Sequence, residues 1–276
     1  MAYAICWITA TEPEARGVRR LRDLDQLVCR KPFGVYRNQG GTEWVVKTGI
    51  GALSCAAGTG FLMGFFGEED ELAFVNVGIA GSQQGEIGAA YLVHKVIDVA
   101  ENKSFFPGVT RFGRAATETC RTVTEPSSTY PEQGMYDMEG SAFFRMAKLR
   151  TDIDSISLIK VVSDTATRPF SELNLANVEP LILGAETLVN DVAEKILDAV
   201  KTVSERRQSP IGFQSMTKTF DFSVSERIQL EKLLRRWALL RPTENPSVVT
   251  AGFEKKEVLP YLTSTLDETP LEFPHD

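Results

Sequence analysis

Histidine is almost absent from this sequence, which contains only His94 and His275. A Ser-His-Asp triad or a histidine-rich metal site is therefore nearly excluded, and acid–base chemistry must come from carboxylates, lysine or tyrosine. Cysteine pairs are missing too, because the four cysteines are scattered and form no CxxC motif. We expect the four thiols to be reduced and mostly buried: those of Cys6, Cys29, Cys55 and Cys120. We predict neither a metal nor a cofactor.

An excess of basic charge and long apolar runs are also lacking. The chain has 30 Lys+Arg against 37 Asp+Glu, a net charge of -7, which argues against a nucleic-acid-binding protein. No apolar run approaches the roughly 18 residues that would span a bilayer. The N-terminal segment meets acidic residues early and has no basic region, so it does not read as a secretory signal. We expect a cytoplasmic protein that binds neither nucleic acid nor membrane.

Nucleotide-binding signatures are absent as well, since no GxGxxG fingerprint, Walker loop or GxSxG elbow occurs. What is present is an alternation of buried strands and amphipathic helices, typical of an α/β protein with helices on both faces of a sheet. Strands are predicted at 3–9, 33–37, 43–48, 72–77, 90–99 and 155–162, with a further one at 119–124. Helices are predicted at about 12–28, 52–66, 138–149 and 170–204, the last with a break near Pro180.

The composition changes near residue 205. Six of the 13 prolines but two of the 21 glycines lie beyond it. A strong amphipathic helix is predicted at about 224–240. We expect residues 1–204 to form the α/β domain and 205–276 a C-terminal helical extension, too small to build its own core and draped over a neighbour.

Polar and glycine-rich segments follow four of the predicted strands. They are Thr9–Glu14, Gly49–Gly51, Gly78–Gly81 and Ser163–Asp164. Because ligands bind beyond the carboxyl ends of strands in an open α/β sheet, these segments are expected to meet at one site.

In order and spacing these segments resemble the purine nucleoside phosphorylase and nucleosidase superfamily (family 1). The resemblance is closest to its hydrolytic branch of methylthioadenosine/adenosylhomocysteine nucleosidases and futalosine hydrolases, and it covers about residues 3–200. It implies a three-layer αβα sandwich with a central mixed sheet, and cleavage of the N-glycosidic bond of a purine ribonucleoside. The motifs are ITATEPEA at 8–15, KTGIGALSCAA at 47–57, FVNVGIAGS at 74–82, GEIGAAYLV at 85–93, YDMEGSAFF at 136–144 and IKVVSDTA at 159–166.

The resemblance assigns the acid and the sugar-binding group. Asp164 would be the general acid that protonates the purine N7, although it could instead cap the segment that follows it. Glu139 would hold the ribose 2′- and 3′-hydroxyls, or serve as a first-turn carboxylate favoured by the helix dipole. Met138 would pack on the sugar face, or simply fill the core.

The attacking group is left open between water and phosphate. In the hydrolytic branch the residue matching Glu14 activates water, but Thr11 and Glu14 also have the spacing of a capping box. Lys160 would tune Glu14 or Asp164, or be a solvated lysine at a strand end. The loop after residue 48 has no arginine, whereas Arg111 and Arg114 could still hold phosphate.

The resemblance also identifies smaller contributions to substrate binding, from Ser163, Gly51, Ile79, Ala80 and Gly81. Ile79 departs from the family, which often has Ser or Thr there. The stretch from about 100 to 135 is short and lacks the helix and strands usual in the family. Its loop aromatics are candidates for stacking on the base or for packing plugs: Phe105, Phe106, Phe112 and Tyr130.

A hydrolytic nucleosidase is thus the leading prediction. The alternatives are a phosphate-dependent phosphorylase, and a nucleoside-binding or scaffold protein that has lost turnover. The expected partners are a small-molecule nucleoside and a second copy of the chain, since members of this superfamily form dimers, trimers or hexamers.

Overall fold

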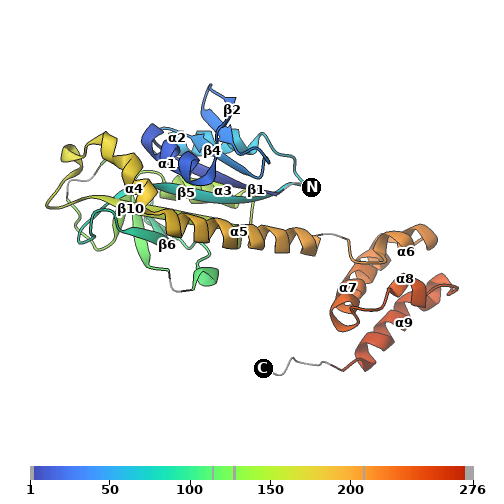
Figure 1. Cartoon of the computed structure of the whole chain (residues 1–276). Helices are drawn as coiled ribbons and strands as arrows, with labels where there is room; N and C mark the ends of the chain where they lie inside the picture. Colours follow the sequence, from blue (N-terminus) through green and yellow to red (C-terminus); the bar gives the residue numbers. More distant parts are fainter. Residues whose placement is uncertain (1–2, 114, 127–128, 208, 271–276) are drawn as a thin grey trace. The chain divides into compact units, whose positions relative to one another are not determined.

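The computed structural model describes residues 3–113, 115–126, 129–207 and 209–270. The chain divides into two compact units, Met1–Val203 and Ser204–Asp276 (Figure 1). The described strands all belong to the first unit, and the second is helical. No helix in the described ranges is both long and apolar enough to cross a membrane.

The first unit is built on a ten-stranded mixed sheet. At its centre β1 (Tyr3–Thr9) runs parallel to β4 (Glu43–Lys47) and to β5 (Glu71–Ser82). Strand β5 also runs parallel to β10 (Ile156–Thr165). Two antiparallel strands, β2 (Gln26–Cys29) and β3 (Gly34–Arg37), extend the sheet beyond β4.

The other half of the sheet curls into a barrel-like circuit. Strand β5 pairs with β10, β10 with β6, β6 with β8, β8 with β9, and β9 with β5 again. The remaining strand, β7, pairs with β6. The stretch from 100 to 135 contains β7 and β8, and β8 lies where the strand at 119–124 was predicted. The bounds are Ala90–Asp98 for β6, Lys103–Phe105 for β7, Thr117–Thr122 for β8 and Met135–Asp137 for β9.

Helices cover both faces of this sheet, which confirms the predicted three-layer α/β architecture. Successive residues of β1 alternate between the two cores, with Cys6 in one and Trp7 in the other. The first core includes residues of α2 (Ala52–Met63) and α3 (Gly140–Lys148). The second includes residues of α1, α4 and α5, and α5 runs along the sheet in Figure 1. Their bounds are Glu12–Arg22, Val178–Gly184 and Glu186–Arg207.

Several predicted element ends were wrong. Helix α1 stops at Arg22 because Asp23 adopts a left-handed conformation with φ 52°, and β2 follows it. The helix expected from residue 170 begins at Val178, after two short 3-10 turns at Phe170–Glu172 and Leu175–Asn177. The chain breaks between α4 and α5, not at Pro180, which lies in the first turn of α4 where proline is tolerated.

The second unit has a hydrophobic core of its own, so the expectation that this segment cannot build one was wrong. Helix α7 (Val224–Leu240) has the predicted bounds, and the helices around it supply the missing apolar partners. The other helices are α6 (Phe213–Thr219), α8 (Pro246–Val249) and α9 (Lys255–Glu268). The buried residues of this core are Met216, Phe222, Leu230, Leu234, Trp237, Val258, Leu262 and Leu266.

Two leucines of α7 test this core. Leu234 is 1% exposed and Leu239 is 82% exposed. Because Leu234→Ala leaves a cavity, we expect it to destabilise the second unit by about 2–5 kcal/mol, whereas the matched Leu239→Ala should cost far less. Hydrogen–deuterium exchange should speed up in α7 and α9 peptides of Leu234→Ala alone. Equally accelerated exchange in peptides from β5 and β10 would contradict a core that belongs to the second unit alone.

Candidate active site

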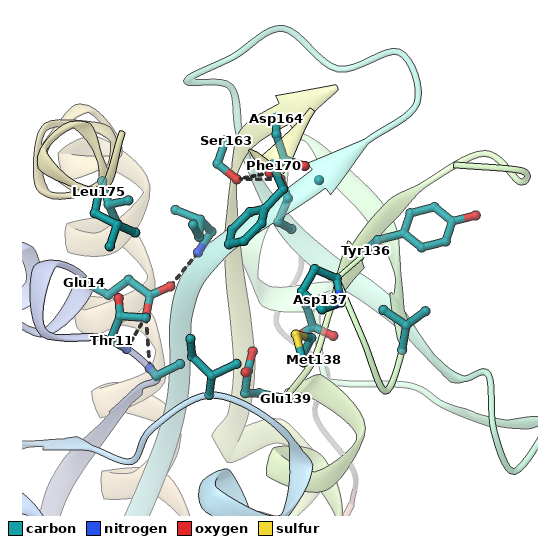
Figure 2. Close-up of a pocket in the computed structure, with 18 of the residues that line it drawn as sticks. Thr11, Glu14, Tyr136, Asp137, Met138, Glu139, Ser163, Asp164, Phe170 and Leu175 are labelled. Carbon is teal, nitrogen blue, oxygen red and sulfur yellow. Dashed lines mark hydrogen bonds between the residues drawn. The ribbon is translucent and has the colours of Figure 1, made fainter. Parts of the chain in front are cut away.

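A pocket opens where β1, β5 and β10 end, and Figure 2 shows side chains from these segments facing it. It encloses about 700 Å³ of empty space, counting the part open to solvent. Eight of the predicted site residues line it: Glu14, Ile79, Ala80, Gly81, Met138, Glu139, Ser163 and Asp164.

Glu14 combines the two functions that the sequence left open, a capping contact and a place in the pocket. Its Oε2 accepts hydrogen bonds from the backbone N–H groups of Ala10 (3.0 Å) and Thr11 (2.7 Å) at the start of α1. Its Oε1 accepts from the N–H of Ile79 in β5, at 2.9 Å. Three amides from two elements thus fix a carboxylate that is only 2% exposed.

Glu139 lies just before α3 and faces the same pocket. Its Oε1 accepts a hydrogen bond of 2.7 Å from the N–H of Gly51. Gly51 has φ 94°, a conformation that favours glycine, so this amide contact depends on the residue type. Gly51 was predicted to contact the substrate, but it does not line the pocket. Its amide instead holds Glu139, which does. Burial, and secondly the neighbouring Asp137 carboxylate, raises the pKa of Glu139 to about 7.

Asp164 lies inside β10, so the alternative that it caps a following segment was wrong. The pairing of β10 with β5 shifts register between Val162 and Asp164, and such a bulge re-aims the side chains that follow it. The Ser163 hydroxyl donates to Asp164 Oδ1 at 2.5 Å, and the Tyr130 hydroxyl donates to Oδ2. Hydroxyls therefore contact both carboxyl oxygens of a side chain at the pocket wall.

Both strands that carry the site are longer than predicted. Strand β5 runs through Gly78–Gly81 and β10 through Ser163–Asp164, where turns were expected. The two segments stay extended because they pair with each other, Asp164 opposite Gly81. The predicted residues of these two segments therefore belong to strand ends and not to loops.

Lys160 is a buried charge beneath the pocket, so the alternative of a solvated lysine was wrong. Its Nζ lies 2.7 Å from Asp137 Oδ2, and the two side chains are 1% and 0% exposed. Burial lowers the pKa of Lys160, but nearby carboxylates, chiefly Asp137, raise it by more, and the net shift is upward. A Cβ built on Gly78 would lie 3.0 Å from Glu14 Oε1 and 3.5 Å from Lys160 Nζ, so both groups face this glycine.

Sequence reasoning missed Asp137, although it lies two residues before Glu139 in the same motif. Asp137 accepts hydrogen bonds of 2.8 Å from the Thr122 hydroxyl and from the N–H of Gly140. It also lines the pocket. Its position next to Met138 and Glu139 was the available signal.

The rest of the described lining is mainly aromatic and aliphatic, and it contains no lysine or arginine. Ala10, Thr11 and Ile50 belong to segments that were predicted to meet at the site. Besides Asp137, the lining residues that were not predicted are Val123, Pro126, Tyr136, Phe170, Leu175 and Val178. Phe170 and Leu175 reach the pocket from the two 3-10 turns that follow β10. Within the described residues no group of three or more His, Cys, Asp or Glu could hold a metal ion.

Of the loop aromatics considered for stacking on the base, one lines the pocket and three do not. Tyr130 lines the pocket. Phe112 is buried in a core, Phe105 packs on Phe144, and Phe106 is exposed. Of the two arginines considered for phosphate, Arg111 lies 3.8 Å from Asp154 outside the pocket lining, and Arg114 lies outside the described residues.

Comparison with known proteins shows what this fold is. No protein-family model matches the chain, and no curated protein is similar to it in sequence. Solved structures do match: 5′-methylthioadenosine nucleosidase of Arabidopsis thaliana has a TM-score of 0.59 at 16% identity, covering 71% of this chain and 96% of that one. The fold is that of the nucleosidases.

Two further nucleosidase-fold structures are similar at low identity. Futalosine hydrolase of Helicobacter pylori has a TM-score of 0.58 at 12% identity, covering 70% of this chain and 98% of its own. The 5′-methylthioadenosine/S-adenosylhomocysteine nucleosidase of Neisseria meningitidis, solved with methylthio-immucillin-A, has a TM-score of 0.55 at 17% identity, covering 69% and 98%. The predicted resemblance to this hydrolytic branch is confirmed at the level of the fold.

The raised pKa of Glu139 makes stability depend on pH. Because folding favours its protonated form, Glu139 contributes stability that is fully present below its ordinary pKa of 4.5 and is lost as the pH rises through about 7. The free energy of unfolding of the wild type minus that of Glu139→Gln should fall across this range, by up to roughly 3 kcal/mol. Urea unfolding of both proteins measures the difference. A difference in unfolding free energy that does not change with pH would contradict a raised pKa of Glu139.

The Lys160–Asp137 pair predicts a non-additive double substitution. Lys160→Met leaves Asp137 buried and unpaired, which should cost about 3–5 kcal/mol of unfolding free energy. Lys160→Met combined with Asp137→Asn removes both charges and should recover part of that loss. Urea unfolding of the two variants and of Asp137→Asn alone gives the coupling. Strict additivity would contradict a direct ion pair.

Proposed function

We propose that the protein is a hydrolytic nucleosidase that cleaves the N-glycosidic bond of a purine ribonucleoside. Asp164 protonates the base, Glu139 binds the ribose hydroxyls, and Glu14 activates the attacking water. One observation carries the proposal: three carboxylates from three separate segments, each less than 8% exposed, face a single pocket.

These groups match the charges that the reaction creates. Breaking the bond builds positive charge on the sugar and negative charge on the departing base. An acid beside the base stabilises the leaving group, and carboxylates near the sugar stabilise the cation. Glu139 and Glu14 are fixed by backbone amides and Asp164 by the Ser163 hydroxyl, so their positions are set before substrate binds.

Water is the favoured nucleophile over phosphate. A phosphate ion needs cations around it, and the described pocket lining includes no lysine or arginine. Lys160 already lies against Asp137 beneath the pocket. Glu14, at the pocket wall, would repel an anion but can accept a proton from water.

The apolar lining supports a neutral substrate. Side chains such as Phe170, Leu175 and Val178 offer contact surface without charge. The similar structures bear the names of 5′-methylthioadenosine nucleosidases and of futalosine hydrolase, and one contains methylthio-immucillin-A. These names support a purine nucleoside with an uncharged or extended 5′ substituent.

A homo-oligomer is part of the proposal. Leu53 of α2 is 86% exposed, and Ile50, three residues before it, is 57% exposed and lines the pocket. A second copy that covered these side chains would bury apolar surface next to the site.

Release of free base from purine ribonucleosides, assayed first without and then with phosphate, tests the function. We expect release without phosphate, and Asp164→Asn should lower kcat by about 10²–10⁴-fold because it removes the proton donor. Substrate binding should change much less. Asp198→Asn makes the same chemical change on the exposed face of α5 and should leave kcat as it is. Strict dependence on phosphate would establish a phosphorylase, and binding without any release would establish a nucleoside-binding protein.

A further inference from the structure

Tyr130 contacts the same carboxylate that is proposed to protonate the base. Its hydroxyl donates a hydrogen bond to Asp164 Oδ2, while Ser163 donates to Oδ1. Burial, and secondly the hydrogen bond to Asp164, raises the pKa of Tyr130, which keeps the proton on the phenol. A hydroxyl donor therefore occupies the oxygen from which a base would have to receive its proton.

The Tyr130 ring also lies where a flat heterocycle would be expected. A Cβ built on Gly81 would meet the Tyr130 hydroxyl first and come within 2.6 Å of two ring carbons, so the hydroxyl end of the ring lies against Gly81. Gly81 pairs with Asp164 across β5 and β10 and lines the pocket. The ring is 4% exposed, and its centre is 5.1 Å from that of Tyr136.

These contacts have the same pattern that a bound purine needs. A purine that receives a proton must bring one polar ring atom to the acid, and its planar ring must lie beside that contact. Tyr130 brings its oxygen to Asp164, and the hydroxyl end of its ring lies beside Gly81. The two rings cannot both lie against Gly81 with a polar atom on Asp164, because that space holds only one.

We propose that Tyr130 is an internal competitor of the heterocycle: its side chain occupies the base-binding part of the pocket, and the base must displace its hydroxyl from Asp164. This inference rests on the proposed function, because it takes Asp164 as the acid. The apparent affinity for a base is then reduced by the fraction of molecules in which Tyr130 holds the position.

Equilibrium binding of adenine, measured by calorimetry, tests this without requiring turnover. Tyr130→Phe removes the hydroxyl and keeps the ring, so the competing hydrogen bond to a carboxylate is lost. We expect adenine to bind about tenfold more tightly to Tyr130→Phe than to the wild type. Tyr36→Phe makes the same change in β3, outside the pocket lining, and should bind adenine as the wild type does.

Unchanged or weaker adenine binding by Tyr130→Phe would overturn the proposal, and so would absence of binding by every variant. If Tyr130→Phe does not fold, Tyr130→Leu, which lacks both ring and hydroxyl, must show the tighter binding instead. The adenine-binding result can be distinguished from the result of the base-release assay that tests the proposed function. Tighter adenine binding without base release by the wild type would support competition by Tyr130 and refute the nucleosidase. Base release with equal adenine affinities would do the reverse.

Discussion

The ion pair between Lys160 and Asp137 is the interaction on which the pocket depends. Four carboxylates, those of Glu14, Asp137, Glu139 and Asp164, are buried around one pocket, and carboxylates held this close repel one another. Among the described residues Lys160 is the one buried lysine or arginine. Its ammonium pairs with Asp137, while burial and secondly the Asp137 carboxylate raise the pKa of Glu139, which favours its protonated form.

The fold supplies the rest of the support through backbone groups. Parallel strands bring the ends of β1, β5 and β10 to one edge, and the amides of Ile79 and Gly51 then reach Glu14 and Glu139. The carboxylates are held by groups that cost little to reorganise during a reaction. Asp164 differs from the other three, because among the described contacts hydroxyls of Ser163 and Tyr130, and no backbone amide, donate to it. In the proposal above the base displaces the second of these hydroxyls.

Much of this could be predicted from the sequence because the signals are local. The bounds of α7 follow from its apolar spacing and from the capping box of Ser223 and Glu226. The site segments at Gly78–Gly81 and Ser163–Asp164 could be found because they stand at the ends of apolar runs typical of buried strands. Pairing over long distances could not be predicted: β5 and β10 continue through the site only because they pair with each other. The same holds for the Lys160–Asp137 contact, the Tyr130–Asp164 contact and the core of the second unit, each of which joins segments far apart in the chain.

A crystal structure with methylthio-immucillin-A would show whether the buried carboxylates act together on one nucleoside. We expect the base against Asp164, the sugar hydroxyls on Glu139, and Glu14 facing the sugar. This expectation would be contradicted by an inhibitor that lies outside this pocket, or by one that contacts neither Glu139 nor Asp164.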